Sequence, residues 1–123
     1  MSDLGWEQVR AWRLARHRLC ERAPRAALVD VASRLCGVHA QLMGSAELTL
    51  WARVDGLEPG AVTELLWERR ALVKTWAMRG TLHLLPATEL CMWIAALGTR
   101  IERQFLNKAR QRYFRFTHEE RCD

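Results

Sequence analysis

Apolar residues recur at every third or fourth position along most of the chain, which is the period of a helix with one buried face. The pattern predicts five helices, over about 6–22, 26–36, 45–54, 61–70 and 88–105. Pro24 separates the first two helices, Gly37 is predicted to be the first residue beyond the second, and Ser45 is a good N-cap for the third. In the second helix, Cys36 is expected on the inward side.

Three of these helices carry long apolar stripes. The stripes are Trp6, Val9, Trp12, Ala15 and Leu19 in the first helix, Leu48, Leu50, Trp51 and Val54 in the third, and Leu90, Ile94, Leu97, Ile101 and Phe105 in the fifth. Arg10, Arg13 and His17 form a second stripe on the first helix, which is either a solvated charged face or a surface that follows phosphates. Arginines and aromatic residues alternate from the second half of the fifth helix onward, which indicates either a nucleic-acid contact or a linker into a partner domain.

One stretch, Val73 to Pro86, departs from the helical period. Its β-branched, aromatic and aliphatic residues lie on either side of Arg79 and Gly80, which predicts two short strands joined by a tight turn. Gly80 can adopt the positive φ that such a turn requires. A two-residue loop would group Lys74, Trp76, Met78, Thr81 and His83 on one face and Val73, Ala77, Leu82 and Leu84 on the other. A three-residue loop would regroup them, and the residues leave the register open.

Helices followed by a single β-hairpin are the arrangement of a winged helix. The expected fold is therefore mainly α with one β-hairpin, a winged helix-turn-helix module with extra N-terminal helices and a long C-terminal helix. Residues 1–86 would form the module, with its hairpin at 73–86, and residues 87–123 would form a long basic helix and the start of a following module. The alternative is a hairpin that only pads a helical core. Glu64 and Glu68 make the helix before the hairpin a poor reader of the major groove.

The composition and net charge of the chain indicate its size class and the kind of partner it binds. The chain has 123 residues, of which half are hydrophobic, so it is long enough for one domain with a core. The net charge is +5 and the pI about 9.6, and nearly all the cations are arginines, which suit bidentate contacts with phosphate. This balance favours a polyanionic partner, although a GC-rich genome would also produce an arginine-rich chain.

Other classes of protein are less compatible with the sequence. No apolar run approaches the roughly 20 residues that span a bilayer, and the first residues lack the order of a secretion signal, so a cytoplasmic protein is expected. The four cysteines are Cys20, Cys36, Cys91 and Cys122. They form no CxxC pair, which argues against a zinc site or a disulfide framework, and they are expected to be reduced, semi-buried thiols.

His39 and Gln41 lie one residue apart between Gly37 and Gly44, where the helical pattern is interrupted. On a helix their side chains would point about 200° apart, but on an extended or turned backbone they point the same way. We predict that Val38 to Gln41 is not regular helix throughout and that at least one of the two side chains reaches a solvent-accessible concavity. Such a pair could hold a water and stabilise a developing charge, as hydrolysis through an oxocarbenium-like transition state requires. A histidine and a glutamine near a helix start are also commonly structural.

Four segments occur in the order WEQVRAWRLARHRL, GVHAQ, SAELTLWARV and LVKTWAMRGTLHLLP. Together they resemble the winged helix DNA-binding domain family that includes the AlkZ/YcaQ-like bacterial DNA glycosylases, and MRGTLHL is their most specific part. The resemblance extends from Trp6 to about Ala95. It implies a monofunctional enzyme that hydrolyses the N-glycosidic bond of bulky alkylated or crosslinked bases in double-stranded DNA, with no metal or cofactor.

The family carries a Gln-aliphatic-Gln motif, or a variant with His first or Asp last, as its catalytic element. The resemblance maps that element onto His39 and Gln41 and leaves open which of the two positions the water. It also implies that the hairpin lies beside the DNA. The residues it suggests as DNA contacts are Lys74, Trp76, Arg79 and His83, to which the basic stripe of the first helix adds Arg10 and Arg13.

Members of this family are considerably longer and are built from several winged-helix modules around a DNA channel. The resemblance therefore implies a truncated member that supplies the first module, with further modules or a second copy of the chain as partners. Two other interpretations remain open. The chain could be a non-catalytic winged-helix module that binds DNA or regulates, or a fragment with neither activity.

Overall fold

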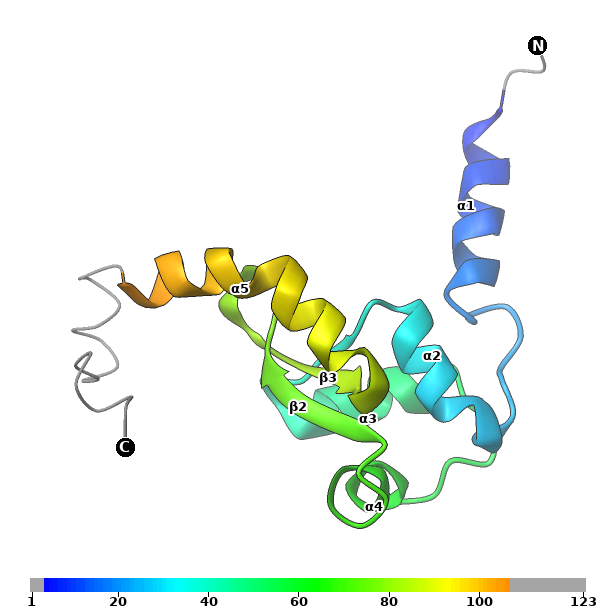
Figure 1. Ribbon diagram of the computed structural model, residues 1–123. Helices are drawn as coiled ribbons and strands as arrows, with labels where there is room; N and C mark the ends of the chain where they lie inside the picture. The colour runs from blue at the N-terminus through cyan, green and yellow to red at the C-terminus, as the bar shows by residue number, and fades with distance from the viewer. Residues whose placement is uncertain (1–3, 107–123) are drawn as a thin grey trace.

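A computed structural model describes residues 4–106 of the chain, and the side chains of residues 4–98 (Figure 1). The elements are α1 (Trp6–Arg16), α2 (Leu28–Arg34), β1 (Val38–His39), α3 (Met43–Trp51), α4 (Ala61–Trp67), β2 (Leu72–Trp76), β3 (Leu82–Pro86) and α5 (Leu90–Leu106). The described part is thus mainly helical, with one small antiparallel sheet that contains the predicted hairpin. The predicted fold class, a winged helix with additional helices, is confirmed.

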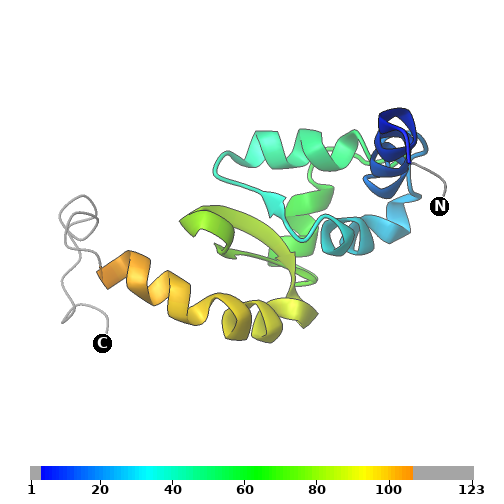
Figure 2. The same cartoon turned by 90° about the horizontal axis from the view of Figure 1, so that it is seen from above.

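Three strands form the sheet in the order β1-β3-β2, and both neighbouring pairs are antiparallel. The sheet lies between two layers of helices, with α3 on one side and α5 on the other (Figure 2). Side chains from α2, α3 and α4 pack with Val38, Leu72 and Leu84 in the hydrophobic core. We call the side of the sheet that carries these three residues the inner face and the opposite side the outer face. The sequence pattern predicted only the hairpin, so β1 is an addition to the expected sheet.

The hairpin closes through a three-residue loop, Met78–Gly80. Trp76 pairs with Leu82, and one step further along the Ala77 N–H donates to the Thr81 carbonyl at 3.0 Å. Arg79 and Gly80 both adopt positive φ, 57° and 67°, so the conformation expected at the glycine is also adopted by the preceding arginine, where it is less favourable. Of the two loop lengths that the sequence allowed, the structure has the longer.

This loop length decides which side chains share a face of the sheet. A shift of one residue in the pairing of the two strands moves every side chain of a strand to the opposite face. Lys74 lies opposite Leu84, whose side chain is in the core, so Lys74 is on the inner side of the sheet. His83 precedes Leu84 and therefore belongs to the outer face, opposite Thr75. The grouping expected for a two-residue loop, with Lys74 and His83 on one face, is wrong.

The helix α1 ends at Arg16, well before the predicted end near Arg22. Arg18 has a φ of 55°, and the Leu19 N–H donates to the Leu14 carbonyl at 3.0 Å. This is the Schellman ending of a helix, with an arginine in the left-handed position that glycine usually occupies. The expected end was wrong because no glycine marked the turn.

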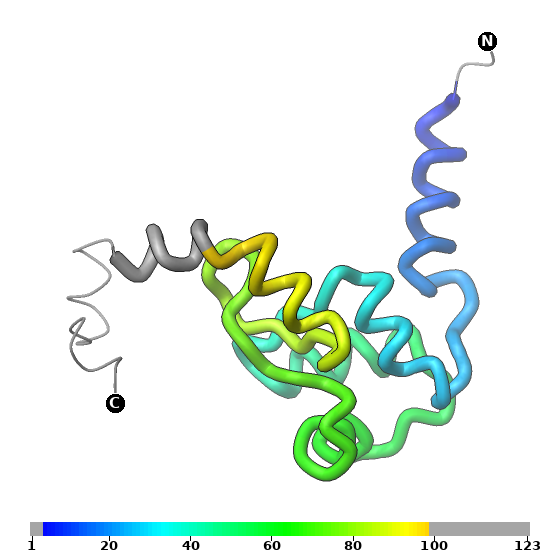
Figure 3. Tube along the Cα trace, in the orientation of Figure 1, coloured from blue at the N-terminus to red at the C-terminus, as the bar shows by residue number. Residues whose placement is uncertain are grey.

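The backbone trace shows that α1 projects away from the rest of the described structure (Figure 3). None of its residues is buried, and Trp6 and Trp12 are 78% and 61% exposed. An apolar stripe of this kind normally faces a core, but among residues 4–98 nothing covers it. The Arg16 guanidinium lies 5.3 Å from the centroid of the Trp12 ring and shields part of that ring.

The helix α2 ends in the same way, and this ending places β1. Cys36 and Gly37 have φ values of 56° and 94°, and the Gly37 N–H donates to the Ala32 carbonyl at 2.9 Å. Gly37 is therefore the second residue beyond the helix cap and not the first, as predicted. A Cβ at Gly37 would lie 2.5 Å from Leu85 Cδ2, so the position requires glycine both for its φ and for this close approach.

Other boundaries and burial expectations need correction. The N-cap of α3 is Leu42 and not Ser45, and α4 ends at Trp67 and not near Arg70, whereas α5 agrees with its prediction. The stripe residues Leu48, Trp51 and Ile94 are 68%, 54% and 58% exposed. Cys20, Cys36 and Cys91 are exposed, so neither the inward placement of Cys36 nor the expectation of semi-buried thiols holds for them.

Some expectations lie outside the described residues, namely Cys122 and the basic residues Lys108, Arg110, Arg112 and Arg115. Among the described helices, none combines the length and the apolar character that crossing a bilayer would need.

Candidate active site on the outer face of the sheet

His39 and Gln41 point away from the core because the backbone around β1 is extended. Ala40, between them, is 0% exposed and packs in the core, while both polar residues are exposed. The Ala40 N–H donates to the Leu82 carbonyl at 2.8 Å, which continues the β1–β3 pairing beyond the strand. The prediction that this segment is not regular helix is confirmed, and solvent reaches both side chains.

His83 is the cross-strand partner of His39. The two imidazole rings meet edge to face, with centroids 5.4 Å apart and an angle of 82° between their planes. His83 is only 8% exposed, and its Nδ1 lies 2.9 Å from the Thr81 carbonyl oxygen. Because a carbonyl oxygen only accepts hydrogen bonds, His83 must carry its hydrogen on Nδ1 in this contact.

Gln41 is tied to the same strand by its side chain. Its Oε1 accepts a hydrogen bond from the Leu82 backbone N–H at 3.3 Å. This bond uses one of the two lone pairs of the carboxamide oxygen, and the NH₂ group supplies the hydrogen-bond donors of the side chain. The outer face therefore presents two different groups close together, an imidazole and an amide donor.

Three cavities of the described structure, with volumes of about 380, 510 and 730 Å³, are lined by residues other than His39 and Gln41. The largest of the three lies between α3, α4 and the inner side of the hairpin, and its lining includes Trp67, Arg70 and Lys74. The expected concavity at His39 or Gln41 stays a prediction.

The structure does not bring the four hairpin candidates together. Lys74 is exposed on the inner side beside the cavity of about 730 Å³, and Arg79 is exposed in the loop between the strands. Trp76, half-buried, shares the inner-face register with Lys74 through its pairing with Leu82. Only His83 lies next to His39.

Arg10 and Arg13 are both exposed on α1, which stands apart from the sheet (Figure 3). They form a basic surface separate from the His39 and Gln41 pair. The structure therefore offers two separate candidate regions for DNA, one on the outer side of the sheet and one on α1.

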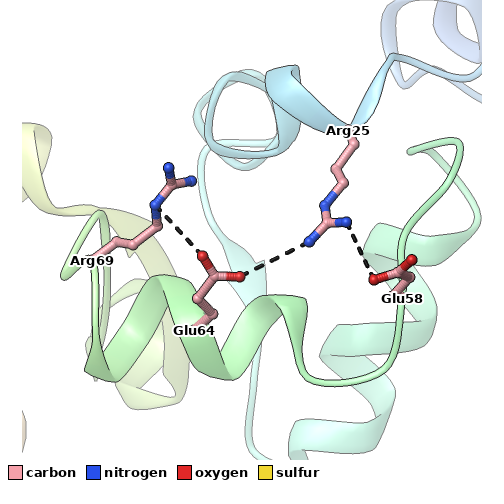
Figure 4. Close-up of polar contacts among 4 residues, drawn as sticks. All are labelled: Arg25, Glu58, Glu64 and Arg69. Atoms are coloured by element: carbon pink, nitrogen blue, oxygen red, sulfur yellow. Dashed lines mark hydrogen bonds and ion pairs between the residues drawn. The ribbon is translucent and has the colours of Figure 1, made fainter.

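One polar cluster was missed by the sequence patterns. Glu64 on α4 lies 3.9 Å from an Arg25 nitrogen and 3.6 Å from Arg69 Nε, and Arg25 also lies 3.3 Å from a Glu58 oxygen (Figure 4). The only signal for this cluster is the regular placement of acidic residues around α4. Its two carboxylates offset its two cations, so it is a weak candidate for binding phosphate.

Within the residues that the structure describes, no group of three or more His, Cys, Asp or Glu side chains is placed to hold a metal ion. The outer-face site consists of His39, Gln41 and the buried His83. Such groups can orient water, donate a hydrogen bond to an oxygen atom and accept a proton.

Comparisons with known proteins identify the family of the chain. The family model described as "DNA glycosylase AlkZ-like" matches residues 32–121. An interstrand DNA cross-link repair glycosylase from Streptomyces sahachiroi is 45% identical over 93 residues, which make up 76% of this chain and 24% of that protein.

Among solved structures, the Streptomyces sahachiroi DNA glycosylase AlkZ superposes with a TM-score of 0.76 and 34% identity, over 96% of this chain and 31% of that one. The chain thus spans 24% to 31% of the length of these relatives. The match with the family model over most of the sequence, together with this relative, shows that the chain belongs to the AlkZ-like DNA glycosylase family.

Proposed function

We propose that the chain is a DNA-binding winged-helix module of a glycosylase that hydrolyses the N-glycosidic bond of bulky alkylated or crosslinked bases. The observation that carries this proposal is the outward orientation of His39 and Gln41 from one extended segment beside the hairpin. Membership of the AlkZ-like family and the repair glycosylase named among the relatives support the reaction class.

In the proposed reaction, a water oxygen forms a bond to the sugar C1′ while the bond from C1′ to the base nitrogen breaks. The base leaves with the electron pair of that bond, and a cationic alkylpurine becomes neutral as it leaves. The imidazole of His39 accepts the proton that the water loses and later releases it to solvent. The step needs water and no other co-reactant.

Gln41 has a different part in this proposal. Its Oε1 already accepts from the Leu82 N–H, and in this proposal Gln41 acts on the substrate through the donors of its NH₂ group. That group can donate to a sugar or phosphate oxygen and fix the position of C1′ relative to His39. We therefore propose His39 for the water-positioning role, which the sequence left open between the two residues.

We also propose that Arg79, at the tip of the hairpin, contacts the phosphate backbone, together with Arg10 and Arg13 on α1. In this proposal Lys74 and Trp76 contribute to DNA binding from the inner side of the sheet, and they do not contact the sugar whose bond is cleaved. Contacts of this kind are independent of sequence, so binding should be weak and should fall steeply with salt, with a slope of about −0.9 for each phosphate neutralised.

The division of the chain follows from the same proposal. Residues 1–86 form the module with its hairpin, and residues 87–123 lead into a following module. The share of the relatives that this chain spans supports the idea that further winged-helix modules or a second copy complete the DNA channel. A protein with this partner is expected in the cytoplasm.

A second candidate function is a module that binds DNA without cleaving the bond. The observation that favours it is that His39 and Gln41 are exposed and line none of the three cavities described above. A water held on an open surface exchanges freely and is poorly fixed for attack.

One experiment separates these functions. The unmodified chain, His39→Ala, Gln41→Ala and Arg79→Ala would be assayed for binding to, and base release from, duplex DNA bearing a bulky alkylpurine. The first two changes should reduce release while leaving the Kd nearly unchanged, since they act on the transition state. Arg79→Ala should weaken binding.

Two outcomes contradict the catalytic proposal. Binding without release by the unmodified chain would favour the non-catalytic module. Release that survives both His39→Ala and Gln41→Ala would show that other residues act. Binding that does not change with salt would exclude the proposed phosphate contacts.

A further inference from the structure

We propose that His83 is a positioning residue that holds the His39 imidazole in its working orientation. This inference rests on the proposed function of His39. It gives His83 a role other than the DNA contact expected from its place in the hairpin, since only 8% of His83 is exposed.

The first observation is the contact between the two rings. His39 and His83 are directly paired across β1 and β3, and their rings meet edge to face with centroids 5.4 Å apart. Aromatic rings prefer this geometry, and at this separation one ring restricts the rotation of the other. His39 itself is exposed and lies in a strand of only two residues, so its side chain has little other packing to fix it.

The second observation is that His83 is fixed independently of His39. Its Nδ1–H donates to the Thr81 carbonyl at 2.9 Å, which sets both the plane of the ring and the nitrogen that carries the hydrogen. A leucine or phenylalanine could fill the same buried space without a polar group to satisfy. The histidine therefore supplies a ring that cannot turn freely.

The third observation is that one short stretch of backbone holds the whole site. The Thr81 carbonyl accepts a hydrogen bond from the His83 ring. The Leu82 N–H donates to the Gln41 side chain, and the Leu82 carbonyl accepts from the Ala40 N–H. The backbone at the start of β3 therefore helps to fix the positions of both the His39 imidazole and the Gln41 amide. A catalytic pair needs such a fixed mutual geometry to act on one sugar.

The test uses three variants of the full chain. His83→Leu removes the ring and the hydrogen bond, and His83→Phe restores the ring without the hydrogen bond. Thr75→Val is the matched control, because Thr75 pairs with His83 from the other neighbouring strand and on the same face. Circular dichroism and thermal unfolding establish that each variant folds; if His83→Leu does not, His83→Phe carries the test.

Nuclear magnetic resonance of the histidine rings gives a readout independent of activity. In the unmodified chain, His83 should be found with its hydrogen on Nδ1. The ring protons of His39 should shift in His83→Leu, because the ring current of His83 is lost, and should move back toward their original values in His83→Phe. Thr75→Val should leave them unchanged.

The second readout is base release from the alkylated duplex. His83→Leu should slow release about three- to tenfold, the fold-change that corresponds to one aromatic pair, while the Kd for DNA changes less than twofold. His83→Phe should recover part of the lost rate. A contact between His83 and DNA predicts instead that the Kd rises as much as the rate falls, which would overturn the proposal.

The proposal also fails if His83 carries its hydrogen on Nε2 or if the His39 signals do not respond to His83→Leu. If the unmodified chain releases no base, the proposed function fails. The resonance measurements still decide separately whether His83 holds the His39 ring.

Discussion

The two faces of the small sheet are built by the same strands but carry different side chains. On the inner face, Val38, Leu72 and Leu84 are 0–1% exposed and pack against helices α2 to α4. On the outer face, His39 is exposed and contacts a second, buried histidine. Since neighbouring residues of a strand point to opposite faces, the packed inner face fixes the positions from which the outer side chains project.

We expect from this difference that stability and site geometry can be changed separately. Truncation of a buried inner-face side chain should destabilise the molecule, whereas truncation of an exposed outer-face polar side chain should leave it folded.

Leu84→Ala should lower the free energy of unfolding by about 2–5 kcal/mol, because Leu84 is 0% exposed in the middle of the core. His39→Ala, one strand away on the outer face, should change it by less than about 0.5 kcal/mol. Urea denaturation followed by circular dichroism measures both. Equal losses in the two variants would mean that the faces are not independent.

Gly37→Ala should lower the free energy of unfolding by about 1–3 kcal/mol, because the new Cβ would meet Leu85 Cδ2 at 2.5 Å and the φ of 94° disfavours alanine. Gly44→Ala is the matched control. It lies in α3 with nothing within 4 Å of the new Cβ, so it should be neutral or stabilise by about 0.5–1 kcal/mol. If both changes behaved alike, the turn before β1 would not depend on its glycine.

Arg25→Ala should lower the free energy of unfolding by less than about 1 kcal/mol. Its ion pairs with Glu58 and Glu64 are largely in contact with water, with side-chain exposures of 50%, 74% and 39%. Thermal unfolding at low and high salt measures the effect, which should shrink as salt rises. A larger loss would show that this cluster supports the packing of α4.

Trp12→Ala should leave stability within about 0.5 kcal/mol of the unmodified chain, because the ring is 61% exposed on a helix that stands apart. Trp6→Ala, with the ring 78% exposed, should behave in the same way. A loss of 2 kcal/mol or more, on the scale of a buried side chain, would mean that α1 packs against the rest of the chain in solution.

Much of the fold could be predicted from the sequence because the spacing of apolar residues distinguishes an amphipathic helix from a strand. It identified α2, α4, α5 and the hairpin, and α5 agrees even in its extent. It could not identify what covers an apolar stripe, so the exposure of α1 was not foreseen. It also missed the end of α1, since Arg18 takes a conformation that a glycine would have signalled.

The site was predicted in part. The interruption of the helical pattern between Gly37 and Gly44 pointed to His39 and Gln41, and the alternation of apolar and polar residues from Val38 to Gln41 was a signal for β1 that a two-residue strand makes easy to overlook. The contact between His39 and His83 depends on the pairing of strands far apart in the sequence. The register of that pairing cannot be derived from either segment alone.

If the outer face of the sheet carries the chemistry, single-turnover base release should respond to changes on that face and not to changes on the inner face. His39→Ala and Lys74→Ala would be compared with the unmodified chain on the same alkylated duplex, at protein concentrations above the Kd. The account predicts that His39→Ala slows release at least about a hundredfold, while Lys74→Ala, on the inner side, stays within about twofold at saturation, where weaker binding no longer limits the rate. Equal losses from the two faces, or no loss from His39→Ala, would contradict it.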